Sequence, residues 1–288
     1  MKKAAFTIRE MHPEDITGAM KLSTAEGWNQ TENDWKVLIE NSKNTCVVAE
    51  CSNTIIGTTT AMNYSNKIAW IGMVLVDKEF RGQGVSASLL TVVLKKLSSF
   101  KSVKLDATPA GQNVYKKFGF REEFEIVRMT NLSIADLPVE IDKNMLAEPV
   151  GSNDVKQISH FDQNIFGVNR PLLIRYLLSE YPQNAWMIKS NNLITGIALG
   201  RAGNKYHHIG PVFGNNINDV KTLIASAANK LKNQPIVVDV LSDKNDLIVW
   251  LITNGFTVQR KFVRMYKGAN LFQGNVENQY LICGPEFG

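Results

Sequence analysis

The sequence predicts a mixed α/β fold that occurs twice in the chain. The chain has 288 residues, 44% of them apolar, so it can bury two cores of ordinary domain size. It also contains an internal repeat: "YKKFGFREEFEIVRM" (115–129) aligns with "LITNGFTVQRKFVRM" (251–265), with Gly-Phe and Arg-Met in the same places. Helical and extended patterns alternate within each copy. We therefore expect two domains of one fold, residues 1–135 and 136–288.

The elements expected in the first copy follow from side-chain periodicity. Helical patterns are bounded by capping signals such as Thr31 before "ENDWKVLIENS", and strands are runs rich in β-branched and apolar residues. Ile71-Gly72 also matches Ile209-Gly210, and the polar segment 133–144 is the predicted linker. In order, the sequence predicts helices at 14–26 and 31–42, strands at 45–51, 54–64 and 67–76, a helix at 85–97, a strand at 102–108, a helix at 111–120 and a strand at 124–132.

Composition limits the classes of function. The formal net charge of +5 and the isoelectric point of about 9.0 suit an anionic ligand, but no basic tract of the kind that binds nucleic acid is present. The N-terminus lacks the apolar core of a signal peptide and no run of 18 apolar residues occurs, so we expect a soluble cytoplasmic protein with no membrane partner. Cys46, Cys51 and Cys283 have neither metal-ligand nor disulfide spacing, and we expect no metal.

A glycine turn, "FRGQGVS" (80–86), lies between the strand ending at Val76 and the next helix. Such a turn presents backbone N–H groups at the positive end of a helix dipole, where phosphate binds well, and Arg81 adds a positive charge. The GxxxxGK[ST] pattern of nucleotide-binding P-loops is absent. The dinucleotide pattern GxGxxA is formally present, but it starts five residues beyond the strand instead of at its end, which argues against that class.

The wider pattern resembles the GNAT superfamily of N-acetyltransferases over residues 6–131. The family's pyrophosphate loop, [RQ]xxGx[GA], is matched by Arg81, Gly84 and Ser86, although Ser86 departs from the usual Gly or Ala. In that family the second half of the acetyl-CoA-binding core ends in Tyr-x-x-x-Gly-Phe. Tyr115, Gly119 and Phe120 match this motif here. The whole layout resembles bacterial tandem-GNAT proteins.

The resemblance implies two GNAT folds, each a mixed, mostly antiparallel central sheet flanked by helices, and acetyl-CoA as the cofactor. It implies that Tyr115 is the acid that protonates the sulfur of CoA. Thr108 stands where the family often has an Asn that contacts the pantetheine arm. The cofactor-binding residues that it implies are Val74, Leu75, Val76, Arg81, Gly82, Gln83, Gly84, Val85, Ser86, Thr108 and Tyr115.

The repeat indicates which copy is active. In place of "DKEFRGQG" the second copy has "VFGNNIND", with one glycine, no Arg, and Asp219 where it would repel phosphate. Leu251 occupies the place of Tyr115. We therefore expect the first domain to be catalytic and the second to keep the fold without the cofactor.

The acceptor amine must lose a proton before it attacks a thioester. Glu26, Asp106 and Asp77 are candidate bases, with Glu26 preferred and deprotonation through water left open. In the family, the connection between the first two helices borders the acceptor. Trp28 and Asn29, which lie in that connection, are therefore candidate substrate contacts, although Trp28 would serve equally as a core side chain.

The second copy offers charged residues for an amino-acid-like acceptor. Asp162 would face its ammonium group and Arg170 its carboxylate, and a structural salt bridge between the two is the alternative. Asp239 could join either arrangement. His207 and His208 are expected to be exposed and not to bind metal.

These observations predict an N-acetyltransferase that transfers the acetyl group of acetyl-CoA to a primary amine of a small molecule, directly within a ternary complex. The alternatives are a protein or peptide N-terminal acetyltransferase and a non-catalytic acyl-CoA-binding sensor. Either a monomer or a homodimer is compatible with the sequence.

Overall fold

The computed structural model describes residues 5–138 and 146–288, so part of the predicted linker, 139–145, lies outside the described residues. The first copy contains β1 (Thr7–Glu10), α1 (Ile16–Ala25), α2 (Glu32–Glu40), β2 (Thr45–Cys51), β3 (Thr54–Tyr64), β4 (Ile68–Val76), α3 (Val85–Lys96), β5 (Ser102–Ala107), α4 (Pro109–Lys117) and β6 (Arg121–Asn131). The second contains β7 (Glu148–Pro149), α5 (Val155–Phe166), α6 (Pro171–Glu180), β8 (Trp186–Ser190), β9 (Leu193–Arg201), β10 (His207–Gly214), α7 (Ile217–Asn229), β11 (Ile236–Leu241), α8 (Asn245–Thr253), β12 (Thr257–Gly268) and β13 (Gln279–Leu281).

The predicted order of elements in the first copy is confirmed, and local chemistry explains it. Thr31 caps α2 through a reciprocal pair of hydrogen bonds with Asp34, as its position predicted. The sequence analysis missed β1, because four residues at the edge of the sheet carry too short a pattern to identify a strand.

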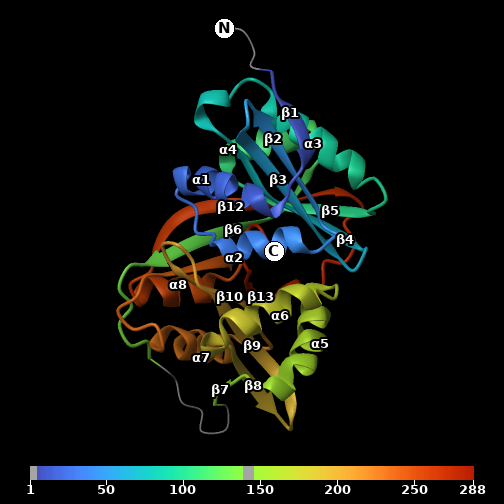
Figure 1. The fold of residues 1–288 in the computed structure, drawn as a ribbon. Helices are drawn as coiled ribbons and strands as arrows, with labels where there is room; N and C mark the ends of the chain where they lie inside the picture. Colours follow the sequence, from blue (N-terminus) through green and yellow to red (C-terminus); the bar gives the residue numbers. More distant parts are fainter. Residues whose placement is uncertain (1–4, 139–145) are drawn as a thin grey trace.

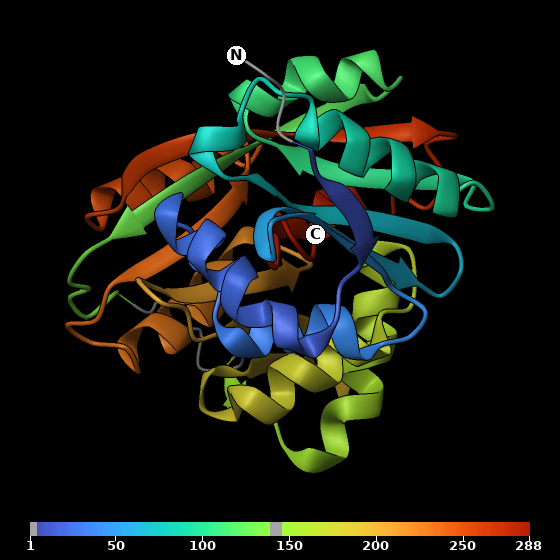
Figure 2. The ribbon, with the colours of Figure 1, turned by 45° about the horizontal axis from the view of Figure 1, so that its top comes forward.

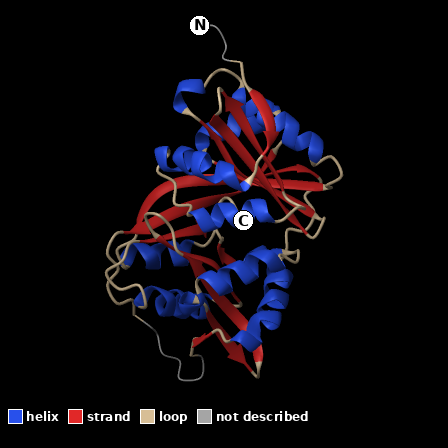
Figure 3. Ribbon diagram, in the orientation of Figure 1, coloured by secondary structure: helices blue, strands red, loops and turns tan. Residues whose placement is uncertain are grey.

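In the described parts of the chain, one continuous sheet of 13 strands runs through both copies in the order β1-β2-β3-β4-β5-β12-β6-β11-β13-β10-β9-β8-β7 (Figures 1 and 3). Its pairs are antiparallel except β4 with β5 and β10 with β11. The first-copy helices α1 and α2 share one hydrophobic core with α5 and α6 of the second copy, while α3 packs on β2 and β3 and α7 packs on β9 and β10.

The two copies exchange the strands that end the repeated unit, β6 and β12. β12 lies between β5 and β6, and β6 lies between β12 and β11, so each final strand pairs with the sheet of the other copy. Two bidentate ion pairs join the exchanged strands to their hosts. Arg128 on β6 binds Asp239 with both N···O distances at 2.7 Å, and Arg264 on β12 binds Asp106 at 2.8 and 2.9 Å. The two arginines occupy the same place in the repeat.

The first copy has an opening between two parallel strands. Pairing of β4 with β5 extends from Ile68 opposite Ser102 to Ile71 opposite Leu105 and stops there. Beyond that point Met73 adopts a left-handed backbone conformation, with φ of 51°, where the register of β4 against β3 shifts. Such a bulge bends a strand, and here the two strands diverge beyond it.

In the second copy the corresponding opening is filled. β10 and β11 pair only at His207 and His208, and β13 then lies between them. Leu281 of β13 pairs with Val212 on one side and with Val240 on the other. The chain's own C-terminal region thus occupies the gap between the two parallel strands.

After β13 the chain continues into the centre of the molecule, between the two copies (Figure 2). We call residues 282–288 the C-terminal segment. The indole of Trp70 donates a hydrogen bond to the carbonyl of Pro285 at 3.0 Å. A Cβ atom on Gly72 would lie 2.9 Å from the Cα of Glu286, so only glycine lets β4 approach the segment this closely.

Candidate active site

A pocket lies at the opening between β4 and β5. Its walls come from those two strands, the exchanged strands β6 and β12, the connection before α2, and the C-terminal segment. The lining residues are Trp28, Gln30, Ile71, Gly72, Met73, Val74, Leu105, Asp106, Thr108, Tyr115, Arg128, Arg260, Phe262, Pro285 and Glu286.

The glycine turn leads from this opening into α3. Gly82 and Gly84 have φ of 75° and 90°, in the left-handed region that favours glycine, and α3 starts directly after Gly84. A Cβ at either glycine would meet no atom within 4 Å, so the surface over the turn is open. Val85 and Ser86 form the first turn of α3, whose N–H groups have no intrahelical acceptors. The turn therefore fits a phosphate group.

Arg81 lies beside this turn with half of its side chain exposed. Its Nη2 is 2.6 Å from a carboxylate oxygen of Glu26, and its Nε donates to the carbonyl of Val76. The amide of Gln83 donates to the carbonyl of Glu79 at 3.1 Å. An anion that reaches the turn meets a guanidinium that is already oriented.

Past the bulge, β4 presents one backbone edge to the opening. Leu75 and Val76 pair with Thr58 and Gly57 of β3 on their other edge, and Val74 lines the pocket. Because β5 has diverged there, an extended ligand can pair with this edge as an added strand would. That is the place where the resemblance puts the pantetheine arm.

Tyr115 belongs to α4 and lines the pocket with only 9% of its surface exposed. Its ring packs edge-on against Phe120 at a centroid distance of 5.9 Å. Burial raises the pKa of the Tyr115 phenol, so the hydroxyl keeps its proton at neutral pH. Thr108 also lines the pocket, and its hydroxyl caps α4 by accepting the N–H of Gly111 at 3.3 Å.

The connection before α2 divides into a pocket residue and a structural one. Trp28 lines the pocket, as a substrate contact would. Asn29 does not: it is buried, its amide donates to the carbonyl of Tyr206, and its carbonyl accepts the N–H groups of Lys205 and Tyr206. Asn29 thus joins the two copies. It lies outside the pocket where the sequence predicted that it would contact substrate.

The three candidate bases do not lie together: one lines the pocket and two lie outside it. Glu26 pairs with Arg81 at the glycine turn and is not among the residues that line the Tyr115 pocket. Asp77 accepts the N–H of Glu79 and likewise lies outside the pocket. Asp106 lines the pocket, but both its oxygens bind Arg264. The predicted role of Glu26 therefore has no geometric support.

Asp162 and Arg170 form the salt bridge that the sequence left open as the alternative. Both side chains are completely buried, their two N···O distances are 2.9 and 3.0 Å, and Arg170 also donates to the carbonyl of Gly288. Neither residue lines the Tyr115 pocket. Their aromatic surroundings, with the ring centroid of Phe166 3.6 Å from the guanidinium, make this pair part of the shared core.

The expectation of exposed histidines is wrong. His208 is buried, with Nε2 3.3 Å from Asp239, and His207 is half-buried and stacks on Tyr181. Burial lowers the pKa of His208 despite the neighbouring carboxylate, so the ring is neutral at pH 7. Asp239 is held by Arg128 and does not line the pocket where an acceptor substrate would bind.

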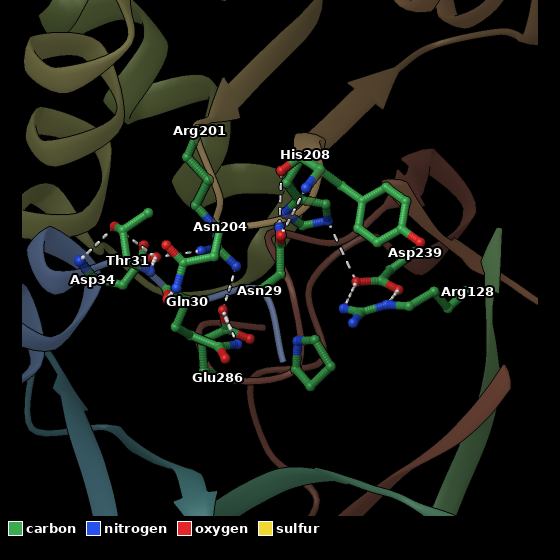
Figure 4. Close-up of polar contacts among 12 residues, drawn as sticks. Asn29, Gln30, Thr31, Asp34, Arg128, Arg201, Asn204, His208, Asp239 and Glu286 are labelled. Atoms are coloured by element: carbon green, nitrogen blue, oxygen red, sulfur yellow. Dashed lines mark hydrogen bonds and ion pairs between the residues drawn. The ribbon is translucent and has the colours of Figure 1, made fainter. Parts of the chain in front are cut away.

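Sequence reasoning missed a buried polar cluster at the pocket wall (Figure 4). Gln30 donates to Glu286 at 2.9 Å, and Arg201 binds both Glu286 and Asp34, the latter at 2.8 Å. Tyr176 also donates to Asp34. Burial alone would raise the pKa of Glu286, but the attraction of Arg201 and the bond from Gln30 hold it below its usual value, so the group is a carboxylate.

Within the described residues, no group of three or more His, Cys, Asp and Glu side chains is arranged to hold a metal ion. No helix in the described part of the chain is long and apolar enough to cross a membrane.

Comparison with known proteins identifies the family. Two family models, each described as an acetyltransferase (GNAT) domain, match residues 10–136 and 158–281. The chain belongs to the GNAT acetyltransferase family. It is a tandem member of this family of acetyl-CoA-dependent N-acyltransferases, as the resemblance implied.

Individual relatives are distant. Holothin acyltransferase from Pseudoalteromonas sp. (strain SANK 73390) is 23% identical over 81% of this chain and 78% of its own. A protein of Pyrococcus horikoshii described as a putative acetyltransferase has the same fold with a TM-score of 0.81 and 19% identity, covering 100% of this chain and 98% of that one. A tandem GNAT protein from the clavulanic acid biosynthesis pathway superposes with a TM-score of 0.62 and 9% identity, over 91% of this chain and 98% of that one.

Proposed function

We propose that this enzyme transfers the acetyl group of acetyl-CoA to a primary amine of a small molecule within a ternary complex in the first copy. The observation that carries the proposal is the open, bulged slot between β4 and β5, which joins the glycine turn at one end and the Tyr115 pocket at the other. The corresponding slot of the second copy holds β13. One acetyl-CoA per chain is therefore expected.

The residues of the first copy suit this cofactor. Arg81 and the N–H groups from Gly82 to Ser86 would hold the pyrophosphate, and the backbone of Val74 to Val76 would hold the pantetheine arm. Acetyl-CoA supplies a thioester carbonyl as the electrophile. Tyr115, which keeps its proton through burial, is positioned to donate that proton to the departing sulfur. The acceptor ammonium would lose its proton to water before attack, since Glu26 faces Arg81 instead of the pocket.

The composition of the pocket wall supports a small acceptor. The C-terminal segment and the 28–31 connection, which Asn204 and Tyr206 of the second copy hold in place, both contribute to that wall. A protein N-terminus would need an open groove there. The Pseudoalteromonas relative is named for the acylation of holothin.

The proposal is tested by calorimetric titration with acetyl-CoA, followed by thiol release with amino acids, polyamines, aminosugars and peptides. We expect one binding site per chain and thiol release with at least one small amine. Release with peptides alone would favour the N-terminal acetyltransferase, and binding without release on any amine would favour the sensor. Two sites per chain would contradict the assignment of the second copy.

A further inference from the structure

The charges around the pocket do not balance locally. Four of the described lining residues carry charged side chains: Asp106, Arg128, Arg260 and Glu286. Asp106 is neutralised by Arg264 and Arg128 by Asp239, each through two hydrogen bonds. These two pairs leave no net charge at the wall they form.

One end of the pocket carries an excess of negative charge. In the described parts of the chain, Arg201 is the one cation that pairs with both Glu286 and Asp34, so two carboxylates share a single positive charge. Gln30 supports this end. Because its amide nitrogen donates to Glu286, its Oε1 is left as an acceptor, and that buried atom has no hydrogen-bond partner among the described residues. At the pocket wall itself, Glu286 and Gln30 therefore present acceptors to a donor with a positive charge.

The exchanged strands place an unpaired cation in the same pocket. Arg260 on β12 lies opposite Arg128 on β6, and no ion pair among the described residues includes Arg260. Its Nε donates to the neutral side chain of Gln259 at 3.2 Å. Burial, together with repulsion from Arg128, lowers the pKa of Arg260, and a bound anion would relieve that repulsion.

We propose that the acceptor is a zwitterion, an amine that also carries an acidic group, with its ammonium facing Glu286 and Gln30 and its anionic group facing Arg260. This inference rests on the proposed function and specifies its substrate class. Such a molecule supplies one charge of each sign where the pocket has the opposite excess. Glu286 comes from the C-terminal segment and Arg260 from β12, so the second copy selects the substrate of the first.

The test compares matched acceptors. Glycine, β-alanine, 4-aminobutyrate and the proteinogenic amino acids are each assayed beside the corresponding amide, which keeps the amine and removes the negative charge. O-phosphoethanolamine beside ethanolamine separates a phosphate from a carboxylate. Thiol release gives kcat/KM for each member of a pair, and calorimetry in the presence of CoA gives its affinity without turnover.

For the best pair, we expect the acidic member to be favoured by roughly tenfold or more, as for a charge-assisted hydrogen bond. Arg260→Gln should reduce this preference by about tenfold, and Arg260→Lys should retain part of it. Glu286→Gln should weaken the binding of acidic and neutral amines alike. The matched control is Lys261→Gln, which removes the neighbouring exposed cation that pairs with Glu125. It should leave kcat/KM unchanged for both the acidic and the neutral acceptor.

Two results would overturn the inference while leaving the proposed function intact. One is equal use of acid and amide by the unaltered enzyme, and the other is a preference that survives in Arg260→Gln. Failure to bind acetyl-CoA, or failure to release thiol with any amine, would instead remove the proposed function and this inference with it. Circular dichroism and thermal unfolding of each variant identify any loss of fold.

Discussion

The two copies carry the same opening between parallel strands and use it in opposite ways. In the first, β4 and β5 diverge after Ile71 and Leu105 and leave a slot beside the glycine turn. In the second, β10 and β11 diverge after His208 and Val237, and β13 fills the gap. The copy without the glycine loop thus has β13 at the place that the proposed cofactor would take in the first copy.

The C-terminal segment touches equivalent points of both copies. A Cβ on Gly72 would press on Glu286, and a Cβ on Gly210, its partner in the repeat, would press on the carbonyl of Ile282. The same segment thus packs against the parallel strand of each copy. In the second copy it follows β13, which fills the opening, and in the first it forms part of the pocket wall.

The largest expected effect tests whether chemistry belongs to the first copy alone. Tyr115→Phe should lower kcat by roughly 100-fold, in the range for loss of a positioned proton donor, and leave acetyl-CoA affinity within about threefold. Tyr280→Phe removes a phenol from β13 in the second copy and should leave kcat unchanged. Steady-state kinetics and calorimetry measure both. Equal turnover in Tyr115→Phe would show that another group protonates the sulfur.

The second prediction compares the two loops. Arg81→Glu should weaken acetyl-CoA binding by at least about tenfold, because it places a negative charge beside the glycine turn. Asn218→Glu adds the same charge to the exposed first turn of α7, the corresponding helix of the second copy, and should leave affinity unchanged. Titration calorimetry measures both variants. A weaker affinity in Asn218→Glu would mean that the second copy takes part in cofactor binding.

The third prediction concerns the shared wall. Gly72→Ala forces β4 and the C-terminal segment apart and should lower the free energy of unfolding by roughly 1–3 kcal/mol, as overpacking does. Gly151→Ala is the control, because the added Cβ there meets only the flexible carboxylate of Asp154. Denaturant unfolding gives both values. If Gly72→Ala is as stable as the unaltered chain, the contact with Glu286 does not hold the segment in place.

The smallest effect separates Glu26 from the chemistry. Glu26→Gln frees Arg81 from an exposed ion pair and should tighten acetyl-CoA binding by roughly two- to fivefold, the range of such pairs. Steady-state kinetics should show turnover within about threefold of the unaltered enzyme. Turnover reduced by roughly 100-fold or more, together with a pH profile that has lost the limb due to the base, would instead restore Glu26 to that role.

Local patterns were enough to predict the repeat and, apart from β1, the elements of the first copy. Thr31, the alternating strands and the glycine turn each act through neighbours in sequence, and the structure places them as expected. The strand exchange could not be predicted, because β6 and β12 have the same side-chain pattern. Either strand could form the hydrogen bonds that the edge of β5 or of β11 requires. Pairing within a copy and pairing between copies therefore look alike in the sequence.

The acceptor side depended on long-range partners. Asp162 and Arg170 have the charges of a zwitterion site, but burial in the shared core commits them to one another and to Gly288. Glu286 belongs to no periodic pattern and reaches the pocket only because β13 directs the segment there. The one available signal was the repeat itself. Asp106 and Asp239 occupy matching strands, as do Arg128 and Arg264, and a charge that occurs at the same place in both copies favours a structural pair.

The reciprocal exchange of β6 and β12 resembles what two identical subunits would form on trading their last strands about a twofold axis. Fusing such subunits into one polypeptide frees them from having to share a sequence. One half can then give up its ligand and specialise as part of its sister's binding site. It cannot be deleted, because the half that remained would lose a strand from the middle of its sheet. The second half is kept by architecture, whatever its chemistry has become.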